Sequence, residues 1–147
     1  MPLQALAILW AGSAHASLGG NADSVARDAL ALSGVLQQAA VTPSPLAVEE
    51  IVTDNGMRVR EFLTGQGVVF AVAWEGPVMP NLAQLLGAKF SSYTAALTAR
   101  DRPELRHGVR VATPDLVVES EGHLRAFVGR AYLPVLLPPG ITLSQLR

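Results

Sequence analysis

A carboxylate and an imidazole occur two residues apart at Glu121 and His123, the strongest acid–base candidate in the sequence. Such a pair can act as a general acid and base when the two groups share a hydrogen bond. Strand alternation places His123 on the same face as Arg125 and Phe127, and a turn at residues 121–122 brings Glu121 near. We favour a simpler interpretation, in which a hydrogen bond across the turn holds a hairpin together.

Four side chains that could ligate a metal lie in the same stretch of chain: Asp115, Glu119, Glu121 and His123. Carboxylate oxygens with one imidazole suit Zn²⁺, Mn²⁺ or Ca²⁺. Their spacing matches no known ligand pattern, and residues along a hairpin strand need not converge on one ion. The sequence therefore predicts no metal site.

Other catalytic chemistries find little support. The sequence has no cysteine and no Gly-x-Ser-x-Gly pattern, and it lacks the glycine loops typical of nucleotide binding. Glu49 and Glu50 are adjacent, so strand geometry directs them to opposite faces and they cannot form a carboxylate dyad. His107 lies in a charged loop, where we expect it to be solvated. We therefore predict no catalytic or cofactor-binding residue and no cofactor.

Trp74 ends an apolar stretch next to Glu75-Gly76-Pro77, where its indole N–H can reach a loop or a groove. Core packing is the favoured interpretation, and alternation predicts Phe70 and Trp74 on one face of a central strand. An exposed sheet face or edge and the segment 74–81 are the expected interaction surfaces. The tentative interaction residues are Trp74, Glu121, His123 and Arg125.

Composition limits the class of protein. The chain has 147 residues, of which 50% are hydrophobic and 16% charged, and this length is typical of one domain. The net charge of −1 removes the electrostatic case for nucleic-acid binding. The absence of cysteine excludes disulfides and thiolate metal sites.

The N-terminal stretch has features of a cleavable signal peptide over residues 1–16. An apolar run from Leu3 to Gly12 precedes Ala14-His15-Ala16, the small-x-small pattern that signal peptidase accepts. The run covers about 15 Å as a helix, too short to cross a membrane. No basic residue precedes it, and a buried N-terminal helix is the alternative. We expect cleavage after Ala16, a globular domain over residues 17–147, and a periplasmic or secreted location.

Hydrophobic periodicity predicts an α+β fold. A helix capped by Asn21 or Asp23 is expected to run to about Ala40, and a second helix is expected to begin after Asn81 and to reach Leu97. The expected strands are Leu46–Thr53, Met57–Thr64, Val68–Glu75, Leu116–Ser120 and His123–Leu133. Asp54-Asn55-Gly56 predicts a type I′ turn, and Glu121-Gly122 predicts the turn of the last hairpin. We expect an antiparallel sheet of about five strands, a meander plus a hairpin, with two helices on one face.

Several fragments carry a family resemblance: residues 17–20 (SLGG), 70–77 (FAVAWEGP), 85–87 (LLG) with Phe90 and Tyr93, 113–118 (TPDLVV), 122–127 (GHLRAF) and 129–131 (GRA). In this order they resemble an exported proteobacterial family, domain of unknown function family 2844. The resemblance covers essentially the whole chain after the signal segment. It implies export and a single domain, and it implies no activity.

These observations predict an exported, non-catalytic binding or structural protein. Its expected partner is an unidentified protein of the cell envelope, with no nucleic acid and no stable membrane insertion after signal cleavage. The alternative is a small exported hydrolase or metal-dependent enzyme that uses Glu121 and His123.

Overall fold

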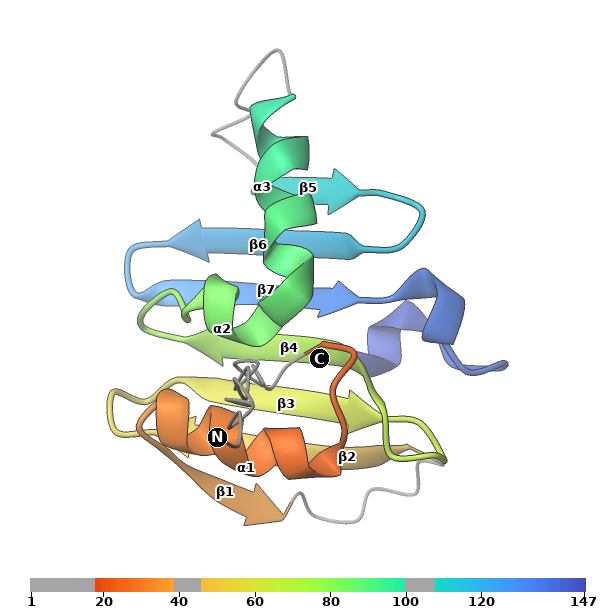
Figure 1. The fold of residues 1–147 in the computed structure, drawn as a ribbon. Coiled ribbons are helices and arrows are strands. Elements are labelled where there is room, and N and C mark those ends of the chain that lie inside the picture. Colours follow the sequence, from red (N-terminus) through yellow and green to blue (C-terminus); the bar gives the residue numbers. More distant parts are fainter. Residues whose placement is uncertain (1–17, 39–45, 100–107) are drawn as a thin grey trace, which may run out of the picture.

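A seven-stranded antiparallel sheet organises the protein, in the order β1-β2-β3-β4-β7-β6-β5 (Figure 1). The computed structural model describes residues 18–38, 46–99 and 108–147. The strands are β1 (Gly34–Gln38), β2 (Ala47–Thr53), β3 (Arg58–Leu63), β4 (Val69–Gly76), β5 (Val109–Ala112), β6 (Val117–His123) and β7 (Ala126–Tyr132). The predicted signal peptide and the charged loop with His107 lie outside the described residues.

The sheet consists of two meanders that meet at its centre. Strands β1 to β4 pair in sequence order, and β5 to β7 do the same. The last strand of each meander, β4 and β7, then pair with each other, so that Ala73 lies opposite Arg130 and Trp74 opposite Gly129. Side chains from the two halves of the chain therefore share each face of the sheet.

The three α-helices that the structure describes cover one face of the sheet (Figure 1). They are α1 (Ala22–Ala31), α2 (Leu82–Leu86) and α3 (Phe90–Thr98), and a 3₁₀ turn at Gly87–Lys89 joins α2 to α3. Asn21 and Asn81 cap α1 and α2 as predicted, because each amide oxygen accepts from the backbone N–H three residues later at 3.2 Å. None of the described helices is long and apolar enough to cross a membrane. The core on this side includes Val25, Ile51, Val59, Val72, Trp74, Leu85 and Leu86.

The predicted fold class is confirmed, but the number of strands is larger than predicted. Residues 34–38, expected to continue the first helix, instead form the edge strand β1. Ser33 leaves the helix with a φ of 54°, and Gly34 lies so close to Ile51 that a Cβ would be 2.6 Å from its side chain. At the opposite edge, β5 has only four residues, too few for a clear alternating pattern.

Phe70 does not share a face with Trp74, so that prediction is wrong. The register of β3 against β4 shifts between Phe62 and Leu63, because Leu63 pairs with Val69 whereas Phe62 pairs with Ala71. Phe70 is the extra residue of this bulge. It lies with Phe62 on the face of the sheet opposite the α-helices, which we call the helix-free face, and the centroids of the two rings are 6.5 Å apart. A bulge moves side chains to the other face without changing the local sequence pattern.

Two turns also differ from the predicted ones, one in its type and one in its position. The loop 54–56 is a three-residue loop in which only Gly56 has positive φ, at 83°, so it is not a type I′ turn. In the last hairpin, β6 runs on to His123 and the turn falls at Leu124-Arg125, where Arg125 has φ 62°. Gly122 lies in β6 opposite Phe127, and a Cβ at this position would be only 2.5 Å from the Phe127 ring, so glycine is the residue that fits.

The helix-free face of the sheet is partly covered by the segment after β7. Its 3₁₀ turns at Pro134–Leu136 and Leu143–Gln145 precede Leu146, which is fully buried. Leu146 packs in a second core with side chains from β3, β4, β6 and β7: Phe62, Phe70, Ala71, Ala73, Val117 and Tyr132. The part of this face that the segment leaves open is charged.

Candidate functional site

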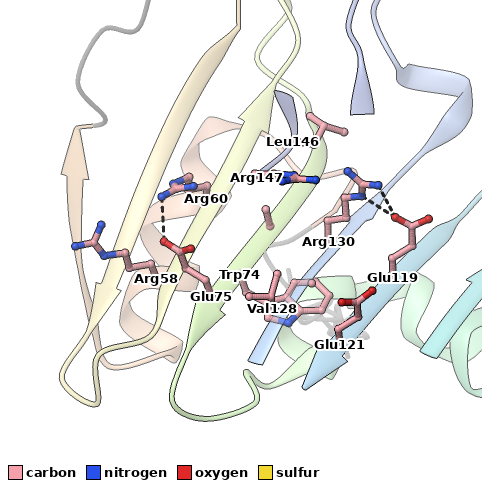
Figure 2. Close-up of a pocket in the computed structure, with 12 residues that line it drawn as sticks. Arg58, Arg60, Trp74, Glu75, Glu119, Glu121, Val128, Arg130, Leu146 and Arg147 are labelled. Carbon is pink, nitrogen blue, oxygen red and sulfur yellow. Dashed lines mark hydrogen bonds and ion pairs between the residues drawn. The ribbon is translucent and has the colours of Figure 1, made fainter. Parts of the chain in front are cut away.

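Charged side chains surround a cavity of about 400 Å³ on the helix-free face, which we call the charged cavity (Figure 2). Strand alternation brings them there, because every second residue of a strand faces the same side of the sheet. The charged residues that line the cavity are Arg58, Arg60, Glu75, Glu119, Glu121, Arg130 and Arg147. They come from four strands and the C-terminal segment.

The cavity lies between two groups of ion pairs. On one side, Arg60 contacts Glu50 at 2.9 Å and Glu75 at 3.2 Å. On the other side, Glu119 contacts Arg130 at 2.6 Å and Arg110 at 3.0 Å.

Ala73 separates these two groups of ion pairs. It lies in register between Arg60 of β3 and Arg130 of β7, and its methyl group leaves space where a longer side chain would bridge them. The small side chain at this position therefore gives the cavity its depth.

The side chains of Glu119 and Arg130 already form hydrogen bonds and ion pairs within the protein. Partial burial alone would raise the pKa of Glu119, but the hydrogen bonds from Arg110 and Arg130 outweigh it and hold that pKa below its usual range. Arg130 also donates from Nη1 to the backbone carbonyl of Leu143. This arginine therefore joins the sheet to the C-terminal segment and has little capacity left for a ligand.

Three other charged side chains at the cavity form no such contacts among the described residues. Among the described residues, no hydrogen bond or ion pair joins the side chains of Arg58, Arg147 or Glu121 to a partner, and all three residues are exposed. Arg147 lies between Arg60 and Arg130, and Glu121 lies beside Val128 (Figure 2). The charged cavity thus offers two free cations and one free anion.

The structure separates the four tentative interaction residues. Glu121 lines the cavity, and so does Trp74, but Trp74 is only 2% exposed and packs in the helix-side core. His123 and Arg125 are exposed at the β6–β7 turn and do not line the cavity.

The prediction that a hydrogen bond between Glu121 and His123 crosses the turn is also wrong. Glu121 and His123 both belong to β6, where they lie two residues apart on one face, and the turn follows them. His123 does not share a face with Phe127, because Phe127 lies opposite Gly122. The prediction failed because it placed the turn at residues 121–122.

The four potential metal ligands do not converge. Asp115 contacts Lys89 at 2.9 Å and Thr113 at 2.8 Å, and these hydrogen bonds lower the pKa of Asp115. Glu119 lies between two arginines. Within the part of the chain that the structure describes, no three His, Asp or Glu side chains are arranged to hold a metal.

A buried carboxyl pair was not predicted. Asp28 of α1 and Glu61 of β3 are both 0% exposed, and Gln84 of α2 donates to Asp28 Oδ1 at 2.6 Å. Burial raises the pKa of Glu61 to about 9, helped by the nearby Asp28 and Glu49 carboxylates, and burial also raises the pKa of Asp28.

Among the described residues, Asp28 Oδ2 and both Glu61 carboxyl oxygens are buried without a hydrogen-bond partner. A proton on Glu61, donated to Asp28, would serve both carboxyl groups. The pair is closed off from solvent, which makes it part of the core rather than a site for substrate. The sequence did contain a signal, because Glu61 falls between Val59 and Leu63 on the apolar side of its strand.

Comparison with known proteins identifies a family but no characterised relative. Residues 14–146 match the model of a family described as "Protein of unknown function (DUF2844)". No curated protein and no solved structure matches the chain. The family match spans nearly all of the 147 residues, and the chain therefore belongs to the DUF2844 family.

Proposed function

We propose that this protein is an exported binding protein without catalytic activity, and that its partner contacts the charged cavity. The observation that carries the proposal is the set of unpaired charges, Arg58, Arg147 and Glu121, lining an open cavity on the helix-free side of the sheet. Ligand sites are concave, and a few polar or charged groups in them fix the orientation of the ligand. From the sequence we propose an unidentified protein of the cell envelope as the partner. Its charged groups would enter the cavity, and the small charged molecules tested below stand for those groups.

The lining of the cavity supports binding rather than catalysis. Its described residues supply guanidinium, carboxylate and apolar groups, and none supplies a hydroxyl, thiol or imidazole. Glu119 is held ionised by two arginines, so it is a poor general acid. The alternative enzyme would depend on Glu121 and His123, of which only Glu121 lines the cavity.

Filling or neutralising the cavity is expected to abolish binding. We expect at least one member of a panel of charged small molecules (amino acids, short peptides, uronic acids and inorganic phosphate) to raise the melting temperature of the native protein. Ala73→Phe fills the space between Arg60 and Arg130, and Arg147→Gln removes a free cation; each should weaken that binding at least tenfold in calorimetric titration. Arg147 is exposed, so its variant tests the site even if Ala73→Phe folds poorly.

His123→Gln is the matched control, because His123 lies on β6 beyond Glu121 and outside the cavity lining. It should bind as the native protein does and should lose less than about 1 kcal/mol of stability, since the side chain is exposed. If no member of the panel binds, the proposed function is wrong. If His123→Gln weakens binding as strongly as Arg147→Gln, the alternative site at Glu121 and His123 is favoured.

Export is expected to leave a mature chain that begins at Ser17. The reason is the Ala14-His15-Ala16 pattern after an apolar run. Edman sequencing of the protein recovered from the periplasm or the medium should read Ser-Leu-Gly-Gly. Recovery of the full-length chain from the cytoplasm would contradict this part of the proposal.

A further inference from the structure

The two edges of the sheet, β1 and β5, differ in how they are protected (Figure 1). An edge strand carries a row of backbone N–H and C=O groups that can pair with a further strand, and proteins block such edges with charges, prolines, bulges or very short strands. Strand β5 has only four residues and packs against α3. It also includes Arg110, which contacts Glu119 at 3.0 Å. These features hinder the addition of a strand at β5.

The edge strand β1 has none of these features. Its sequence, Gly-Val-Leu-Gln-Gln, contains no charge and no proline, and its five residues pair one to one with β2 without a bulge. Val35 is 64% exposed and Leu36 is 41% exposed, and alternation directs them to opposite faces of the sheet. Among the described residues, no strand pairs with the outer side of β1. This edge is therefore open and partly apolar.

Leu36 ends an apolar row of the helix-side core. It lies opposite Ile51 of β2, and Ile51 lies opposite Val59 of β3. Residues opposite each other in neighbouring strands share a face of the sheet, so all three side chains lie on the side of the helices. Ile51 and Val59 are 0% exposed, whereas Leu36 stays exposed because the sheet ends at β1. An apolar side chain opposite Leu36 on a further strand would continue this row.

We propose that β1 is the interface of a dimer, in which it pairs antiparallel with β1 of a second copy of the chain. A two-fold axis at Leu36 pairs all five residues of each strand, whereas any other register leaves some of them unpaired. Leu36 then lies opposite the second copy's Leu36, and Val35 lies opposite its Gln37. Such a symmetric contact uses the same surface of both copies, and the two sheets become one continuous sheet.

The absence of charge on β1 is the reason to choose a second copy as the occupant of this edge. Two uncharged strands meet without the like-charge repulsion that opposes self-pairing. The charged residues of the neighbouring strand β2 are Glu49 and Glu50, and three strand spacings, at least about 14 Å, separate their α-carbons from those of the second copy. Screening by salt acts over about 8 Å, so these carboxylates do not oppose the dimer. Glu50 is also paired with Arg60 at 2.9 Å.

The dimer would leave the charged cavity open in both copies. Strand β2 lies between β1 and β3, and no residue of β1 or β2 lines the cavity. Five paired residues make a small interface compared with those of stable dimers. We therefore expect association that increases with protein concentration.

Sedimentation equilibrium over a range of concentrations tests the dimer. The native protein should rise from the mass of one chain to twice that mass. The double variant Val35→Lys with Gln37→Lys should weaken dimerisation at least tenfold, because positions 35 and 37 lie opposite each other across the axis and like charges there repel. Both substituted side chains are exposed, so the change falls on the surface of the monomer.

Val35→Lys with Gln37→Glu is the matched control. It also removes Val35 and also places two charged side chains on β1, but the antiparallel register sets each lysine opposite a glutamate of the second copy. This variant should dimerise at least tenfold more tightly than the one with two lysines. The comparison isolates the charge and tests the register at the same time.

Cross-linking tests the position of the axis without charged variants. The chain has no cysteine, so Leu36→Cys introduces a single thiol. Two such residues opposite each other have Cβ atoms about 4.5–5.5 Å apart, close enough for a disulfide after a small adjustment. Mild oxidation should therefore join two chains covalently. Leu30→Cys is the control, since Leu30 is 80% exposed on α1 and away from the strand edge, and it should give little covalent dimer.

Three outcomes would overturn the dimer. The first is a native protein that stays monomeric at every concentration, which would leave a strand of another protein as the occupant of this edge. The second is equal dimerisation of the two double variants. The third is cross-linking of Leu30→Cys as readily as Leu36→Cys. Failure of the ligand panel would not affect these measurements, so the dimer and the proposed function can fail separately.

Discussion

Glu61→Gln is expected to remove most of the dependence of stability on pH between about pH 5 and pH 9. Burial raises the pKa of the folded-state Glu61 carboxyl from 4.5 to about 9. Below pH 4.5 the folded and unfolded chains both hold this proton, so the raised pKa has no effect on stability there. Above it, only the folded chain keeps the proton, and the free energy of unfolding falls by about 1.4 kcal/mol per pH unit.

The free energy of unfolding stops falling at the pH where Glu61 of the folded protein also loses its proton. Stability contributed by the neutral Glu61 is therefore lost progressively up to about pH 9 and changes little above that value. At pH 7 the accumulated loss is roughly 3 kcal/mol, a large part of the stability of a typical domain. Glutamine cannot ionise, and its amide can still donate to Asp28, so the variant should be more stable than the native protein at neutral and higher pH.

Urea unfolding at pH 5, 7 and 9 measures this effect. Glu121→Gln is the matched control: it removes an exposed carboxyl group from the same sheet and should leave the native pH dependence in place. If Glu61→Gln and the native protein lose stability in parallel as the pH rises, the Asp28–Glu61 pair does not share a proton as we describe.

Trp74→Ala is expected to lower the free energy of unfolding by about 3–5 kcal/mol. The indole is 2% exposed and packs in the helix-side core, which also contains Leu85 and Leu86 of α2. Its ring also covers Gly129, where a Cβ would be 2.3 Å from Trp74 Cζ2. Removing the ring leaves a cavity at the joint between the two meanders, where β4 pairs with β7.

The midpoint of urea unfolding tests this expectation. Val128→Ala is the control, since Val128 is next to Gly129 but 56% exposed, and its truncation should change stability by less than about 1 kcal/mol. An unchanged midpoint for Trp74→Ala would show that the ring is not packed as described. A folded variant that lost only ligand binding would instead make Trp74 an interaction residue.

Local sequence signals determined much of the secondary structure and the fold class. Asn21 and Asn81 mark helix starts because their side chains cap the first turn, an interaction within three residues. The alternation in β2 and β3 and the glycine at position 56 determine a hairpin in the same local way. Family membership also follows from the sequence, since it depends on residues in order along the chain.

Contacts between distant parts of the chain decided the edge strand β1, the face on which Phe70 lies and the assembly of the charged cavity. Residues 34–38 form a strand because β2 offers them an open edge, and Phe70 changes face because of the register between β3 and β4. The alternating charges Arg58 and Arg60, and Glu119 and Glu121, are visible in the sequence, but they face one cavity only because β4 pairs with β7. Strand order is set by the packing of the whole sheet rather than by local preference, so only the tertiary structure could bring these charges together.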